Sequence, residues 1–71
     1  MKDNLRRLQW CLKLFGYDDF YTVSVTDSEV RLQGEYSNKI TTKAKRLRFS
    51  SKIDGNGYLD MHRNNITITL T

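Results

Sequence analysis

The sequence has few of the residues that cross-link a fold or break its regular structure. Among its 71 residues there is no proline, one cysteine (Cys11) and one histidine (His62). A single cysteine excludes an internal disulfide and is in keeping with a reducing compartment, so we expect a cytoplasmic protein. The sequence also lacks an apolar run of bilayer-spanning length, and Lys13 interrupts the N-terminal apolar segment. Neither a signal peptide nor a membrane partner is therefore expected.

Patterns that support catalysis are equally scarce. Cys11 falls on the apolar face of a predicted helix, far along the chain from His62, and a buried apolar thiol is usually inert. No histidines and cysteines are spaced as metal ligands, and no glycines form a phosphate-binding loop. The sequence therefore predicts a protein that is not an enzyme and that uses no metal and no cofactor.

One stretch, DGNGYLD, resembles the middle of the calcium-binding loop of the EF-hand family. When Gly57 is aligned with the required glycine of that loop, Asp54 and Asp60 fall on ligand positions. The first and last ligand positions are then occupied by Lys52 and Arg63, whose charges would repel the ion. The residues after Asp60 alternate as in a strand, whereas the family has a helix there. We therefore expect a β-turn that starts at Asp54, and no calcium binding.

Acidic residues are missing between Tyr36 and Ile53, although this segment carries six of the twelve lysines and arginines. The rest of the chain has six basic and eight acidic residues, so the positive charge is concentrated in one segment. A helix from Ser37 or Asn38 to about Leu47 would carry most of it as a stripe, made of Lys39, Lys43, Lys45, Arg46 and Arg48. The stripe is either a solvated helix face or a binding site for nucleic acid or another polyanion.

Two aromatic residues flank this basic stripe. Tyr36 precedes it and Phe49 follows it. In the polyanion-binding interpretation, both rings are expected to stack on unpaired bases.

The first predicted helix, about residues 3–15, has an apolar face and two apolar residues beside it. Leu5, Leu8, Cys11, Leu12 and Phe15 recur at helical spacing and form the expected core face. Trp10 and Leu14 lie four residues apart on another side. They are either covered by the chain that follows the helix or form a patch that contacts a partner or a second subunit. The second interpretation supports the hypothesis of a protein-interaction module.

The remaining sequence alternates in two hairpins. In the first, Val23 and Val25 are expected opposite Leu32 and Val30. The second turns at the asparagine pair 64–65, and the uncharged final strand, ITITLT, should lie inside the sheet or beneath another chain. The expected fold is one compact α+β domain over 1–71. Its order is helix, hairpin, helix, hairpin, with an extra short strand at 49–53 as a variant, and both helices pack on one face of an antiparallel sheet.

These observations favour a small basic protein that works by binding another macromolecule. The expected partner is a protein, either a different chain or a second copy in a homodimer, and the site would include Trp10 and Leu14. The alternative is nucleic acid or another polyanion bound by the basic stripe.

Overall fold

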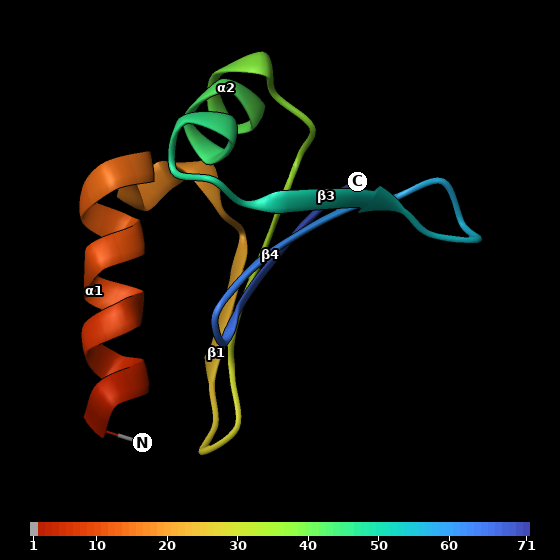
Figure 1. The fold of residues 1–71 in the computed structure, drawn as a ribbon. Coiled ribbons are helices and arrows are strands. Elements are labelled where there is room, and N and C mark those ends of the chain that lie inside the picture. The colour runs from red at the N-terminus through yellow and green to blue at the C-terminus, as the bar shows by residue number, and fades with distance from the viewer. Residues whose placement is uncertain (1) are drawn as a thin grey trace.

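The computed structural model describes residues 2–71, which form two α-helices, one short 3-10 helix and five strands (Figure 1). The helical elements are α1 (Lys2–Phe15), η1 (Tyr17–Asp19) and α2 (Asn38–Arg46). The strands are β1 (Thr22–Val25), β2 (Val30–Gly34), β3 (Ser50–Ile53), β4 (Leu59–Arg63) and β5 (Ile66–Leu70). The α+β class is confirmed, and the extra strand expected at 49–53 is present as β3. No helix in the described part of the chain is long and apolar enough to cross a membrane.

The strand order is β1-β2-β5-β4-β3, and the sheet is mixed. The expectation of a purely antiparallel sheet is wrong, because β2 and β5 are parallel neighbours. The physical reason lies in the connection through α2. A helical crossover brings β3 back in the direction of β2, and two hairpin reversals then give β5 that same direction. Hairpin patterns determine only the pairing of consecutive strands, so this long-range pairing has no local signal.

The predicted hairpin registers are confirmed. Val25 lies opposite Val30 in the first hairpin, and Met61 lies opposite Ile68 in the second. The final strand β5 lies between β2 and β4, which confirms that it is inside the sheet. It therefore cannot pair with the sheet of a partner, and the free edges belong to β1 and β3.

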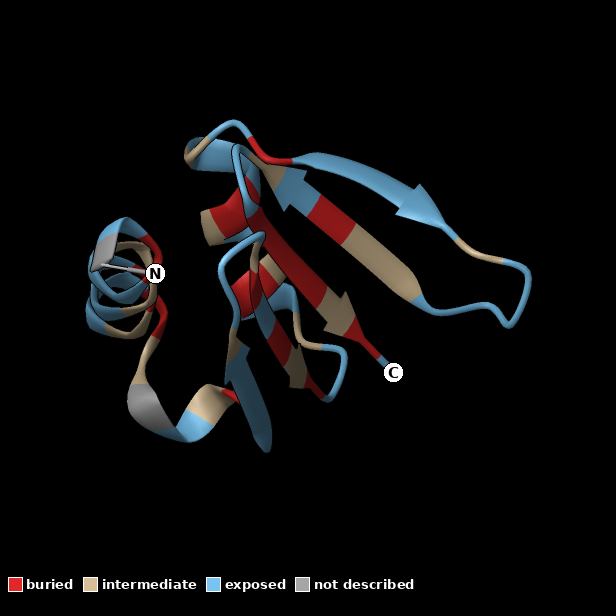
Figure 2. Ribbon diagram, turned by 90° about the horizontal axis from the view of Figure 1, so that it is seen from below, coloured by how far each residue is buried: buried red, intermediate tan, exposed pale blue. Residues whose placement is uncertain are grey.

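The core lies between the helices and one face of the sheet (Figure 2). Alternate strand residues supply its floor, among them Leu32 and Ile68, which are both fully buried. The helices divide this face unequally: α1 runs beside β1 and β2, whereas α2 sits over one end of the sheet. The side of the sheet near β3 is consequently the least covered, and every residue of β3 is exposed.

Only part of the predicted apolar face of α1 reaches this core. Cys11 and Phe15 are buried, but Leu5 is 46% exposed, so its assignment to the core is wrong. Leu5 lies in the first half of the helix, away from the three packed rings near its C-terminal end. There Phe15 makes edge-on contacts with Phe20 and Phe49, at centroid distances of 5.9 and 6.2 Å.

Both ends of α2 are capped. Ser37 is the N-cap, and its side chain accepts a hydrogen bond from the backbone N–H of Lys39, as the sequence predicts. At the other end, Arg48 N–H donates to the Lys45 carbonyl and Phe49 N–H donates to the Ala44 carbonyl. This is the Schellman pattern. Arg48 has a φ of +64°, which places a non-glycine residue in the left-handed region.

Candidate functional site

The exposed edge of the sheet at β3 offers unpaired backbone groups. Asp54 N–H donates to the Tyr58 carbonyl just beyond the β3–β4 ladder. This bond shows which residues of β3 are hydrogen-bonded to β4. In an antiparallel pair these bonds alternate, so Ser50 and Lys52 face β4. The backbone N–H and C=O groups of the residues at 51 and 53 therefore point away from the sheet. β3 presents two donors and two acceptors to solvent.

A hollow of about 280 Å³ opens beside this edge, which we call the β3 groove. It lies between α2 and the helix-facing side of β3 and β4. Its lining includes Tyr36, Lys45, Ser51, Leu59 and Met61. The Tyr36 side chain is 59% exposed, so an apolar surface is accessible at the mouth of the groove.

Ile53 continues this apolar surface toward the end of the hairpin. It lies opposite Leu59 across the ladder, so both side chains project from the helix-facing side of the sheet. Ile53 is 68% exposed because no helix extends over this end. A large apolar side chain therefore lies in solvent directly beside the unpaired backbone of β3.

The predicted basic stripe on α2 is divided among different contacts. Lys39 forms an ion pair with Asp19 at 3.5 Å, and Lys43 donates from its Nζ to the Leu14 carbonyl at 2.7 Å. Lys43 thus neutralises the negative end of the α1 dipole. Lys45 lines the β3 groove instead. Two of the five stripe residues therefore already have partners within the protein.

Of the remaining stripe residues, Arg46 lies beside Lys43 in one small hollow, whereas Arg48 lies beyond the end of α2. Leu14 also lines this hollow. Phe49, which we expected to stack on bases, is only 8% exposed and packs in the core. Of the two rings that flank the stripe in the sequence, only Tyr36 is therefore exposed.

Trp10 and Leu14 are each 37% exposed, but they contribute to separate hollows. Leu14 lies with Lys43, Arg46 and Leu47 near α2. Trp10 lies in a larger hollow of about 440 Å³, which we call the Trp10 groove. The Trp10 groove is lined by Arg6, Arg7, Trp10, Arg63, Asn64 and Ile66.

Sequence reasoning missed the arginines of the Trp10 groove. The sequence patterns do not single out Arg6 or Arg7, and they indicate Arg63 only as a residue that occupies a calcium-ligand position of the EF-hand loop. The structure brings them together because the β4–β5 hairpin turns beside α1, and the Arg63 guanidinium carbon lies 5.4 Å from the Trp10 ring centroid. The helical spacing of Arg6 and Trp10 was a usable signal, since residues four apart lie on one side of a helix.

The EF-hand-like stretch forms the predicted turn. Gly57 N–H donates to the Asp54 carbonyl at 3.0 Å, which closes a four-residue turn. The Asp54 carboxylate accepts from the backbone N–H groups of Asn56 and Tyr58. Asp60 lies in β4 and accepts from Thr69 Oγ1 at 2.8 Å. Residues 2–71 contain no group of three or more histidines, cysteines and carboxylates arranged to hold a metal.

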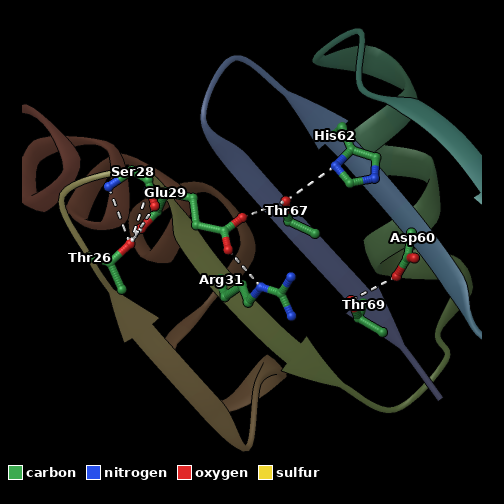
Figure 3. A network of polar contacts seen from close by, with 8 residues as sticks. All are labelled: Thr26, Ser28, Glu29, Arg31, Asp60, His62, Thr67 and Thr69. Carbon is green, nitrogen blue, oxygen red and sulfur yellow. Dashed lines mark hydrogen bonds and ion pairs between the residues drawn. The ribbon is translucent and has the colours of Figure 1, made fainter.

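The sheet face opposite the helices carries a polar network across β2, β5 and β4 (Figure 3). Arg31 pairs with Glu29, Thr67 Oγ1 donates to Glu29, and His62 Nδ1 lies 3.2 Å from Thr67 Oγ1. Cys11 lies in the core on the other side of the sheet, so it is separated from His62 in space as well as along the chain. Burial raises the pKa of the Cys11 thiol to about 11, although the charge of Arg63 opposes this shift.

The comparisons with known proteins give no relative from which a function could be inferred. No protein-family model matches this chain, and neither the curated proteins nor the solved structures include a significant match to it.

Proposed function

We propose that this protein is a non-enzymatic binding module that accepts an extended, acidic segment of a partner protein along β3. The observation that carries the proposal is the unpaired edge of β3 beside the apolar β3 groove. An added strand would satisfy the outward N–H and C=O groups of residues 51 and 53. Main-chain hydrogen bonds of this kind provide affinity, and pockets for alternate side chains provide specificity.

The apolar surface next to the edge suits every second side chain of such a segment. Ile53 and Tyr36 are 68% and 59% exposed, and both lie on the helix-facing side. A strand paired with β3 would place alternate residues over Ile53 and into the β3 groove. The partner segment is therefore expected to alternate apolar residues with polar ones.

The positive charge near β3 indicates that the polar residues of the partner segment are acidic. Lys45 lines the groove, Lys52 lies in β3 with its side chain on the other face of the sheet, and Arg48 lies two residues before this strand. The whole stretch between Tyr36 and Ile53 has no acidic residue. A second copy pairing β3 with β3 would bring these like charges together, which is unfavourable. An acidic segment of a different protein is therefore the better match.

The polyanion alternative at the basic stripe has less support. Lys39 and Lys43 are bonded to Asp19 and to the Leu14 carbonyl, and Phe49 is buried. The stripe therefore offers fewer free cations and one ring fewer than the sequence indicates.

The experiment is a selection of heptapeptides from a random display library on the full chain, followed by NMR mapping of the selected peptides. Enriched peptides should alternate apolar and acidic residues, and they should shift the amide resonances of Ser51 and Ile53. Ser51→Pro removes an outward donor without touching the ladder and should abolish binding. Val23→Pro is the matched control, because Val23 lies in the other edge strand, β1, and its backbone N–H also points away from the sheet.

Selection of basic peptides, or of none, would contradict the proposal. So would equal loss of binding in the two proline variants, because the effect would then reflect general damage to the sheet. Light scattering would detect a dimer. If Ser51→Pro disrupts this dimer and Val23→Pro does not, a second copy pairs with β3, and the proposal of an acidic partner segment is wrong.

A further inference from the structure

We propose that the Trp10 groove is a binding site for the phosphate group of a nucleotide, with the base stacked on the Trp10 indole. This site has no lining residue in common with the β3 groove, so it stands independently of the protein-binding function.

The groove is lined by three arginines from two separate elements. Arg6 and Arg7 come from α1, and Arg63 comes from the end of β4. No acidic residue lines the groove, and no ion pair involves these arginines within the described residues. Asp3 lies on the preceding turn of α1, yet it makes no ion pair with them in that part of the chain. Within residues 2–71, the positive charge of the groove is therefore not neutralised by a close ion pair.

Two of the three arginines are held in place. Arg63 lies over the Trp10 ring as a cation–π pair at 5.4 Å. Arg7 Nη1 donates to Asn4 Oδ1 at 2.7 Å, and Asn4 Nδ2 donates to the Thr26 carbonyl at 2.7 Å. Asn4 is only 2% exposed, so it is a rigid support for Arg7. Guanidinium groups fixed before binding lose less conformational entropy when an anion arrives.

The amount of charge favours phosphate over carboxylate. Three arginines line the groove, whereas a carboxylate supplies one negative charge. A phosphate monoester carries about −1.5 to −2 at neutral pH and offers three acceptor oxygens. The planar fork of arginine matches such oxygens in pairs. A phosphate therefore neutralises the groove better than a single acidic side chain does.

The indole adds a preference for an aromatic group attached to the phosphate. Trp10 is 37% exposed and Arg63 lies over one face of its ring, so the base would stack on the part of the indole that Arg63 leaves open. Stacking of a base on an aromatic side chain contributes about 1–3 kcal/mol. A hollow of about 440 Å³ also falls in the size range of small-molecule sites. The shared chemistry of a free nucleotide and of an unpaired nucleic-acid strand fits this site.

Trp10 is the only tryptophan, so its fluorescence reports directly on the groove. The full chain would be titrated at low salt with inorganic phosphate, adenosine monophosphate and an eight-nucleotide thymidine strand. We expect quenching of Trp10 and at least about tenfold tighter binding of the nucleotide than of inorganic phosphate, because only the nucleotide stacks. If the strand binds far more tightly than the mononucleotide, the natural source is a nucleic acid. Similar affinities would identify a free nucleotide.

Arg63→Gln tests the site, and Arg48→Gln is the matched control with the same charge change outside it. Arg63→Gln should weaken nucleotide binding about tenfold, which corresponds to losing one charge-assisted contact. It should also reduce the salt dependence of strand binding by about one phosphate contact. Calorimetry would repeat the measurement, because Arg63→Gln alters the surroundings of the fluorescent ring.

Three results would overturn the proposal. The first is an absence of quenching and of binding heat with all three ligands at millimolar concentration. The second is an equal loss of binding in Arg63→Gln and Arg48→Gln, which would indicate attraction to the overall positive charge. The third is displacement of the nucleotide by an equal concentration of a glutamate-rich peptide, which would show that the groove is a protein-binding site.

Discussion

The left-handed residue at the end of α2 gives a direct test of how the fold is stabilised. Arg48 occupies the position in the Schellman motif where glycine is the usual residue, and its φ is +64°. The two hydrogen bonds of the motif involve backbone atoms only. The substitution Arg48→Gly therefore keeps both bonds and removes the steric conflict of the side chain.

The expected size of the effect is a difference of two opposing terms. Left-handed geometry costs a non-glycine residue about 1–2 kcal/mol. Glycine loses more conformational entropy on folding, and this opposes the gain by about 0.5–1 kcal/mol. The Arg48 side chain makes no ion pair within the described residues, so no further loss is expected. Arg48→Gly should therefore raise the free energy of unfolding by about 0.5–1 kcal/mol.

Thermal and urea unfolding followed by circular dichroism would measure this change. For a domain of this size, the melting temperature should rise by about 2–8 °C. Lys45→Gly is the matched control, because it places glycine at a right-handed helical position of the same helix, and it should lower stability by about 1 kcal/mol. Arg48→Ala keeps the strain and should be nearly neutral. Destabilisation by Arg48→Gly comparable to Lys45→Gly would refute the reasoning.

Three further predictions concern the core. A Cβ atom at Gly34 would lie 2.5 Å from the Asp19 carbonyl oxygen, so Gly34→Ala should lower the free energy of unfolding by about 1–3 kcal/mol in urea titrations. Asn4→Leu leaves the Thr26 carbonyl without its partner and should lower the melting temperature, at a cost of about 1–3 kcal/mol. Because burial raises the pKa of Cys11 to about 11, its contribution to stability should be complete below pH 9.0 and should be lost as pH rises to about 11. The difference in stability between the wild type and Cys11→Ala should shrink over that interval, and an unchanged difference would contradict the assignment.

The local structure could be predicted from the sequence because local patterns determine it. Alternation of apolar and polar residues fixes which residues of a hairpin face each other, and Met61 does lie opposite Ile68. The parallel pairing of Val30 with Ile66 joins residues far apart in the chain, and no spacing rule indicates it. The exposure of Leu5 likewise depends on how far the sheet extends beneath α1, which the periodicity of a helix cannot show.

The candidate sites divide in the same way. Trp10 could be singled out because it is a large apolar residue outside the apolar face of its helix. Its neighbour Arg63 could not, since their approach depends on where the β4–β5 hairpin meets α1. The ion pair of Lys39 with Asp19 depends on the short helix η1, which the sequence did not indicate.

The central pairing of β2 with β5 also has a consequence for how the chain reaches its fold. Each pair of residues in this ladder is separated by 36 positions, whereas the other three ladders join consecutive strands. Closing a loop of that length costs about 3 kcal/mol of chain entropy before any contact compensates for it. The β1–β2 hairpin and the β3–β4–β5 meander can therefore form early, and their docking through β2 and β5 limits the rate of folding.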